Sequence, residues 1–263
     1  MRQEIEMVFG RRFWLSVAIM LICFSGYAAL EWIAVGNWPV EVRPSSLQQT
    51  IGGIFFGGVM LLMPLCASLS SGLLQVEELQ CAFVDLRIIK SSVHKYIVQK
   101  FTASFLCGAT SVGLAFSIHA IIWNIVATPC NPIVNSYTAI PFANNCIYYS
   151  WEAFCYGLPI YLWMLLWISF CGGMWSFVGI TAAMYIPDKI IAIAVPFCIY
   201  YLWHCGFPQA LLNLKWFPHP ADLYNDALTW DVVGISLMVY ALLGLTCLAL
   251  YSIRIQRRYK HEK

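Results

Sequence analysis

Long stretches without charged residues alternate with short charged segments along this chain. Six windows contain no Asp, Glu, Lys or Arg: 13–30, 51–76, 101–150, 153–187, 190–214 and 232–253. A helix needs roughly 20 apolar residues to cross the hydrocarbon layer of a membrane. The pattern therefore predicts one membrane crossing in each window.

Helix-breaking residues set the ends of these predicted crossings. Pro129, Pro132 and Pro141 indicate a loop in the second half of the third window, and Pro159 delays the start of the next helix. After residue 203 the fifth window passes into a Gly- and Pro-containing segment, which we expect to be a structured outer region. The predicted membrane helices are 13–35, 51–76, 101–126, 160–184, 190–203 and 232–253.

Composition favours the same fold class. The chain is 60% hydrophobic and only 11% charged, whereas soluble domains carry about 25% charged and about 45–50% apolar residues. A soluble fold could not bury so much apolar surface. We therefore expect an all-α integral membrane protein, with one transmembrane domain spanning residues 1–263 and membrane lipids around it.

The distribution of Lys and Arg predicts the orientation. With six crossings, both termini lie on the same side of the membrane. Only Arg43 and Lys215 fall on the opposite side, and the other thirteen of the fifteen basic residues share the side of the termini. Because basic residues concentrate on the cytoplasmic side, we expect a plasma-membrane protein with both termini in the cytoplasm. The loops 36–50, 127–152 and 204–230 then face outward.

The segment 77–100 is the only sizeable charged stretch between two predicted crossings. Its apolar residues recur at helical spacing and are expected to share one face: Leu79, Phe83, Leu86, Val93 and Ile97. This pattern is typical of an amphipathic helix at the membrane surface, with Ser91 or Ser92 capping the next crossing. From the pattern alone, such a helix could equally lie on anionic lipids.

The order of residues in this segment resembles the permease subunits of ABC-2 type ABC transporters. The resemblance rests on the acidic pair Glu77-Glu78, on Asp85-Leu-Arg87, and on Ser91, Lys95-Tyr96 and Lys100 leading into the next helix. It implies that 77–92 is the coupling helix, which docks on the ATP-binding subunit. Phe83 and Leu86 would be its apolar plug, and Glu78, Asp85 and Arg87 its polar rim.

Two other segments also resemble this family. Pro187-Asp188-Lys189 would be the short cytoplasmic turn between the fourth and fifth helices, with Pro196 inside the fifth helix. Residues 1–12 would be the interfacial elbow helix. The outer loop 127–152 departs from the family pattern because it is long and rich in Pro.

The chain lacks the phosphate-binding loop that an ATPase needs, because it contains no Gly-x4-Gly-Lys-Ser/Thr sequence. ATP and Mg²⁺ would therefore bind a partner, and this chain would be a non-catalytic subunit without a cofactor or nucleic-acid partner. Six helices with one coupling loop make half a translocator. We expect a second permease copy or a paralogue, together with ATP-binding cassette subunits.

Other classes of membrane protein remain as alternatives. An intramembrane protease is disfavoured because Ala82 occupies the position where a Glu-Glu-x3-Arg motif needs Arg. An ion-coupled secondary transporter would need an ionisable group at depth. His119 is the candidate for such a group, with a hydrogen-bonded structural histidine as its alternative. A membrane sensor or immunity protein also remains open.

Cysteine positions indicate one possible disulfide. Most of the cysteines fall within predicted helices, where Cys behaves as a small apolar residue. Cys130 and Cys146 instead bracket an outward loop, where an oxidising environment allows a bridge; two free thiols are the alternative. No spacing of Cys and His suggests a zinc site.

Aromatic residues predict the class of cargo. They cluster in the outer half of the predicted bundle: Trp38, Tyr148, Tyr149, Trp151, Tyr156, Tyr161, Trp163 and Trp167. Such a lining would suit an amphipathic cargo, although aromatic residues also serve as ordinary interfacial anchors. The resemblance to small peptide and antibiotic exporters favours an amphipathic peptide, and lipid, drug or polysaccharide export stays open.

Overall fold

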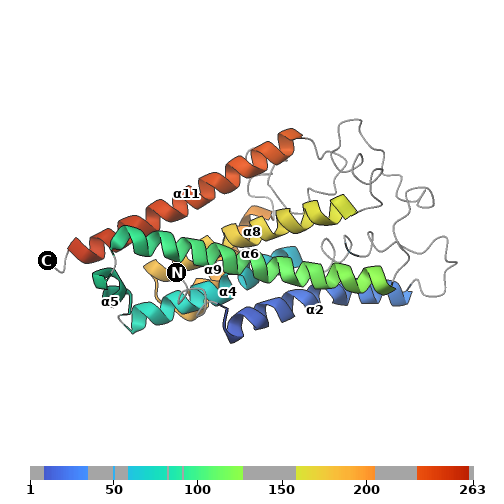
Figure 1. The fold of residues 1–263 in the computed structure, drawn as a ribbon, viewed down its shortest axis with the longest axis horizontal. Coiled ribbons are helices and arrows are strands. Elements are labelled where there is room, and N and C mark those ends of the chain that lie inside the picture. The colour runs from blue at the N-terminus through green and yellow to red at the C-terminus, as the bar shows by residue number, and fades with distance from the viewer. Residues whose placement is uncertain are drawn as a thin grey trace.

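The computed structural model describes residues 9–34, 50, 59–81, 83–90, 92–126, 158–204 and 230–260. Within these residues the chain is all-helical, as predicted, with seven helices and no strand (Figure 1). The helices are α2 (Arg11–Ala34), α4 (Val59–Gln80), α5 (Phe83–Lys90), α6 (Val93–Val126), α8 (Leu158–Tyr185), α9 (Lys189–His204) and α11 (Trp230–Lys260).

Among the residues that the structure describes, four helices are long and apolar enough to cross a membrane: α2, α6, α8 and α11. Helix α9 is apolar but has only 16 residues, fewer than the roughly 20 that a crossing needs. Helix α4 is not among the four within the described part of the chain, which omits residues 51–58 of its predicted crossing. The composition and these four helices are those of a membrane protein.

Several helices extend beyond their predicted ends. Helix α4 continues to Gln80, so the acidic pair at 77–78 belongs to its last turn, and the segment 77–92, expected to be one helix, is divided between α4 and α5. Helix α6 begins at Val93 and not near 101. The helices are longer than the predicted crossings because a charged residue marks the edge of an apolar segment, whereas a helix ends only where its backbone hydrogen bonds end.

Local caps explain two of the observed helix starts. The hydroxyl of Ser92 accepts a hydrogen bond from the Lys95 amide at 3.3 Å, as one of the two predicted caps; Ser91 lies outside the described residues. Asp188 caps α9 in the same way, since its Oδ1 accepts the amides of Ile190 at 2.8 Å and Ile191 at 3.1 Å. The predicted short turn between α8 and α9 is therefore present at 186–188.

Charged residues gather at one end of the bundle. Figure 1 shows α5, the beginning of α6 and the end of α11 at the same end of the molecule. The end of α4 reaches the α8–α9 turn there, because Gln80 Nε2 donates to the Pro187 carbonyl at 3.1 Å. Helix α2 begins at Arg11, and residues 1–8 of the predicted elbow helix lie outside the described residues.

Small residues allow α6 and α8 to pack closely. A Cβ atom added at Gly172 would lie 2.7 Å from the Gly108 carbonyl oxygen, and one added at Gly108 would lie 2.5 Å from that of Gly172. Beside this crossing the Ser104 and Ser176 hydroxyls lie 3.1 Å apart. Serine hydroxyls and glycines at helix contacts are common in membrane bundles, because they permit close approach without a buried unpaired polar group.

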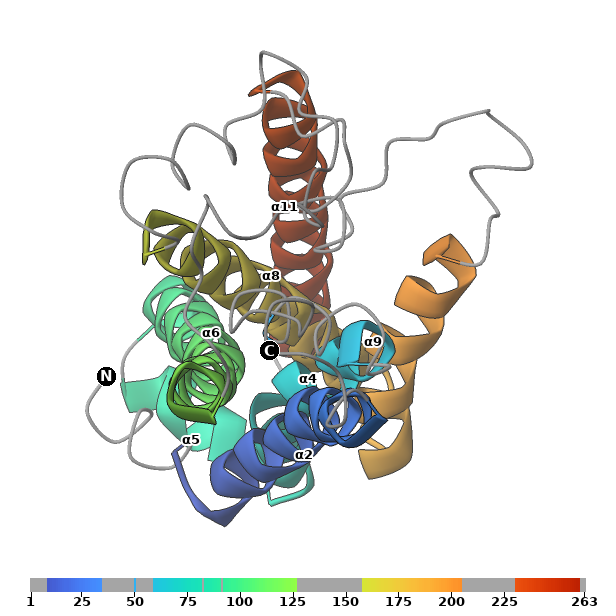
Figure 2. The ribbon, with the colours of Figure 1, turned by 90° about the vertical axis from the view of Figure 1, so that its right-hand side faces the viewer.

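The two terminal helices expose apolar faces. Viewed along the bundle, α11 stands against α8 and away from α2 (Figure 2). Ile22 and Leu30 of α2 are each 70% exposed, and Leu245 of α11 is 62% exposed. Helices that are apolar on their outward faces are expected in a lipid environment.

Candidate functional site

The last turn of α4 carries an acidic pair that joins helices from several parts of the chain. Glu77 binds Arg12 at the start of α2 through two hydrogen bonds, of 2.9 and 2.5 Å. Lys189 at the start of α9 lies 3.2 Å from the same carboxylate. One side chain therefore connects the charged ends of α2, α4 and α9.

The electrostatics of Glu77 follow from these contacts. The hydrogen bonds from Arg12 lower the pKa of the Glu77 carboxyl below its ordinary value, burial partly opposes this effect, and Lys189 adds to the lowering. The Glu77 side chain is 35% exposed and that of Arg12 is 36% exposed. Because solvent screens pairs of this kind, the contribution to stability is modest.

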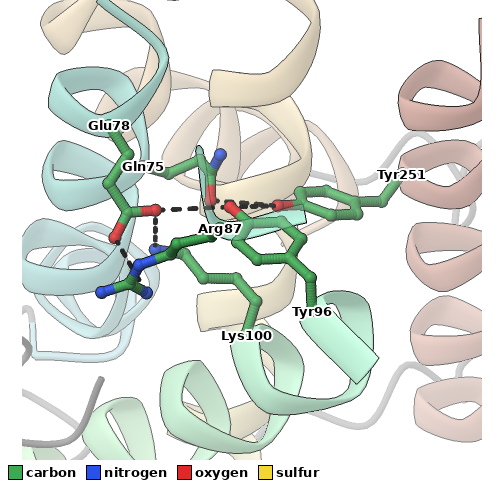
Figure 3. Close-up of polar contacts among 6 residues, drawn as sticks. All are labelled: Gln75, Glu78, Arg87, Tyr96, Lys100 and Tyr251. Carbon is green, nitrogen blue, oxygen red and sulfur yellow. Dashed lines mark hydrogen bonds and ion pairs between the residues drawn. The ribbon is translucent and has the colours of Figure 1, made fainter. Parts of the chain in front are cut away.

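Glu78, the next residue on this turn, points about 100° away from Glu77 and is buried, with only 4% of its side chain exposed. Its Oε2 accepts a hydrogen bond from Lys100 Nζ at 2.7 Å and one from the Tyr96 hydroxyl at 3.3 Å. Arg87 of α5 lies 3.7 Å away, beyond hydrogen-bond distance, with its Nη1 facing Oε1 (Figure 3). Helices α4, α5 and α6 therefore meet at one buried carboxylate.

The pair of Lys100 with Glu78 is costly to separate. Lys100 is 1% exposed, although it lies in the third turn of α6, where the sequence suggested an ordinary cytoplasmic charge. Removing one partner of a buried ion pair typically costs about 3–5 kcal/mol, because the remaining charge is left without compensation in a region of low dielectric constant. This pair therefore fixes the position of α4 against α6.

Two further polar side chains extend the junction to α11. The Tyr251 hydroxyl lies 3.0 Å from Gln75 Oε1 and 3.4 Å from the Tyr96 hydroxyl (Figure 3). Its single proton can be donated to only one of these acceptors at a time. Tyr96 donates its own proton to Glu78, so a hydrogen-bonded path from the buried carboxylate to α11 exists when Tyr251 donates to Tyr96.

Helix α5 lies over this junction with two different apolar faces. Val84 and Ile88 point inward and are buried, at 0% and 8% exposure. Phe83, Leu86 and Ile89 point outward and are 38%, 55% and 79% exposed. The predicted continuous face is therefore interrupted, since Leu79 belongs to α4 and is buried there.

An ion pair also joins α5 to α11. Asp85 Oδ2 accepts a hydrogen bond from Arg258 Nη2 at 3.2 Å.

Burial lowers the pKa of Arg87, whose guanidinium lies 4.5 Å above the centre of the Phe83 ring. The five residues proposed for ATPase coupling thus divide into an exposed apolar pair, Phe83 and Leu86, and charged residues that bind other helices.

His119 has the environment of a structural histidine. It is fully buried, its Nδ1 lies 3.1 Å from the Ser25 hydroxyl, and its Nε2 lies 3.3 Å from the carbonyl of Thr50. A carbonyl oxygen can only accept, so Nε2 carries the proton. The ring also stacks on Phe24 at 5.4 Å. These contacts are those of the structural alternative, and proton transfer by His119 stays a hypothesis.

Sequence reasoning identified part of this junction. It selected Glu78, Asp85 and Arg87 as site residues but not the other members of the junction: Tyr96 and Lys100, which bind Glu78; Arg258, which binds Asp85; Arg12 and Lys189, which bind Glu77; and the pair Gln75 and Tyr251. Tyr96 and Lys100 are four residues apart and so share one face of α6, a signal that could have paired them with the acidic residues. Cys130 and Cys146 lie outside the described residues.

No protein-family model, no curated protein and no solved structure matches this chain.

Proposed function

We propose that this chain is a permease subunit of an ATP-driven ABC exporter, with α5 as the coupling helix that docks on a separate ATP-binding subunit. The observation that carries the proposal is the two-sided character of α5. Its inner side is anchored by Val84 and Ile88, while Phe83, Leu86 and Ile89 are exposed on its outer side. A helix that transmits force must be held by the membrane domain and still present a surface to its partner.

Helix lengths support a location of α5 beyond the membrane surface. Helix α6 has 34 residues and α11 has 31, corresponding to lengths of roughly 50 Å and 45 Å at about 1.5 Å per residue. The hydrocarbon layer is only about 30 Å thick. The charged ends of both helices would therefore project from the membrane beside α5, where a soluble subunit could reach them.

The remaining parts of the proposal follow from the resemblance to ABC-2 permeases. The partner subunit would bind ATP and Mg²⁺, and a second permease copy or a paralogue would complete the translocation path. Helices α4 and α9 would complete six membrane crossings with cytoplasmic termini in the plasma membrane. The aromatic outer half, with Trp163 stacked on Trp167 at 6.2 Å, suits an amphipathic peptide as cargo.

The test is co-purification of this chain with a candidate ATP-binding cassette subunit expressed together with it. Phe83→Ala should weaken the association by about 2 kcal/mol, a roughly 30-fold loss of affinity, because partly exposed aromatic anchors dominate such interfaces. Arg87→Ala should weaken it less. Leu242→Ala, at an outward position of α11 that is 59% exposed, is the matched control and should leave association unchanged.

A helix that merely lies on lipid would give a different order of effects. Phe83→Ala would then be mild, and joint neutralisation of Arg87, Lys90 and Lys95 would be severe. The isolated chain should hydrolyse no ATP. Robust ATP turnover by the purified chain, or an assembly indifferent to Phe83 and Leu86, would contradict the proposed function.

A further inference from the structure

Arg87 lies between the exposed and the buried parts of the junction. Its guanidinium carbon is 4.5 Å from the centre of the Phe83 ring, which is on the face proposed to dock. Its Nη1 is 3.7 Å from Glu78 Oε1, which is inside the bundle. One side chain on α5 therefore interacts with the docking surface and with the carboxylate that joins α4 to α6.

Glu78 uses its two oxygens unequally. Oε2 accepts hydrogen bonds from Lys100 and Tyr96, whereas Oε1 has no donor within hydrogen-bond distance among the described residues. A buried carboxylate oxygen without a donor is unfavourable. A charged hydrogen bond is about 2.8 Å long, so Arg87 would need to approach by roughly 0.9 Å to form one.

We propose that Arg87 is a switch that moves from the Phe83 ring to Glu78 Oε1 when a partner engages that ring. Closing the 3.7 Å gap requires α5 to move toward α4, and in the free chain the interaction with the Phe83 ring also opposes that movement. When a partner engages Phe83, this opposition is lost, and the charged hydrogen bond to the buried carboxylate offsets the cost of moving α5. Closing the Arg87–Glu78 contact draws α5 toward the end of α4.

The contacts around Glu78 carry this movement to α11. Tyr96 donates to the same carboxylate, and the Tyr251 hydroxyl lies 3.4 Å from that of Tyr96. On the opposite side of α5, Asp85 holds Arg258 at 3.2 Å. The switch would thus pull on α4 and α11 together, whereas α5 without it could rock on Val84 and Ile88. The identity of the engaging partner as an ATPase rests on the proposed function.

Removal of the Phe83 ring should imitate engagement in the full-length chain alone. In Phe83→Leu we expect amide hydrogen exchange across 83–90, measured by mass spectrometry in detergent, to slow about tenfold, because a charged hydrogen bond now pins α5. The same substitution in a Glu78→Gln background should produce no slowing. Ile89→Leu, at the most exposed apolar position of this face, is the control and should exchange like the wild type.

If the Glu78→Gln variant does not fold, the same test can be made with Arg87→Gln in its place. Phe83→Leu combined with Arg87→Gln should also exchange at the wild-type rate, since no guanidinium remains to bind Oε1. Unchanged exchange in Phe83→Leu, or slowing that persists without Glu78 or Arg87, would overturn the switch. No ATPase takes part in the exchange experiment, so its failure would reject the switch but not the docking role of α5. Conversely, a failure to co-purify with an ATPase would reject the docking role but not the switch.

Discussion

Lys100 shows how a single residue acquires a role that its neighbours in sequence do not share. It is buried against Glu78, while Lys95, five residues earlier on the same helix, is exposed. Both lysines count equally toward the orientation of a membrane protein. Only Lys100 is removed from solvent and paired with a carboxylate, so only Lys100 is expected to contribute substantially to the free energy of unfolding.

We therefore predict that Lys100→Met destabilises the chain by about 3–5 kcal/mol, because Glu78 loses its closest compensating charge. Lys95→Met should change stability by less than about 0.5 kcal/mol, as exposed substitutions usually do. Thermal unfolding in detergent measures both. Adding Glu78→Gln to Lys100→Met should restore part of the loss, and equal effects of the two lysine substitutions would contradict the assignment.

Glu77 predicts a dependence of stability on pH. Its pKa is lowered in the folded chain, chiefly by the hydrogen bonds from Arg12. The stabilisation is therefore present above the pKa of the unfolded carboxyl, about 4.3, and is lost as pH falls through the lower pKa of the folded state. Glu77→Gln should lower the unfolding temperature at pH 7 and make little difference near pH 3. A deficit of the same size at both values would exclude this linkage.

At the scale of elements, the crossing of α6 and α8 depends on the absence of side chains. Gly172→Ala would place a Cβ atom 2.7 Å from the Gly108 carbonyl oxygen and 2.8 Å from Val112. Overpacking of this kind costs about 1–3 kcal/mol. Gly26→Ala on α2 is the matched control, because nothing lies within 4 Å of its added Cβ.

The expected result is a lower unfolding temperature for Gly172→Ala alone. Gly26→Ala should be neutral or should stabilise by up to about 1 kcal/mol, since Ala favours a helix more than Gly does. Similar unfolding temperatures for the two variants would mean that α6 and α8 can separate at this crossing without loss.

At the scale of the whole molecule, the charged ends of the helices lie together, and the proposal places them in the cytoplasm. Two single-cysteine variants test this, one retaining Cys81 and one carrying Lys260→Cys. A membrane-impermeant maleimide should label both only in inside-out vesicles. Ile33→Cys, near the far end of α2 and 75% exposed, should be labelled from outside. Labelling of Cys81 and position 260 from opposite sides would refute the arrangement.

The class of structure follows from the pattern of apolar and charged residues alone. Runs of apolar residues without charge have few stable forms other than a membrane helix, because a backbone in lipid must satisfy its own hydrogen bonds. Capping is equally local, and Ser92, one of the two serines expected to cap the next helix, does cap α6. The charge-free windows did not locate the end of α4 or the start of α6, because these helices continue beyond the apolar layer.

Packing between distant segments determines which charges are buried and which partners they bind. Glu77 and Glu78 are adjacent in sequence, yet one binds Arg12 in partial contact with solvent and the other binds Lys100 inside the bundle. Successive residues of a helix point about 100° apart, so neighbours meet different helices. Which helix each one meets depends on packing between segments up to 176 residues apart, as for Tyr251 and Gln75. Such long-range packing cannot be predicted from the pattern of neighbouring residues.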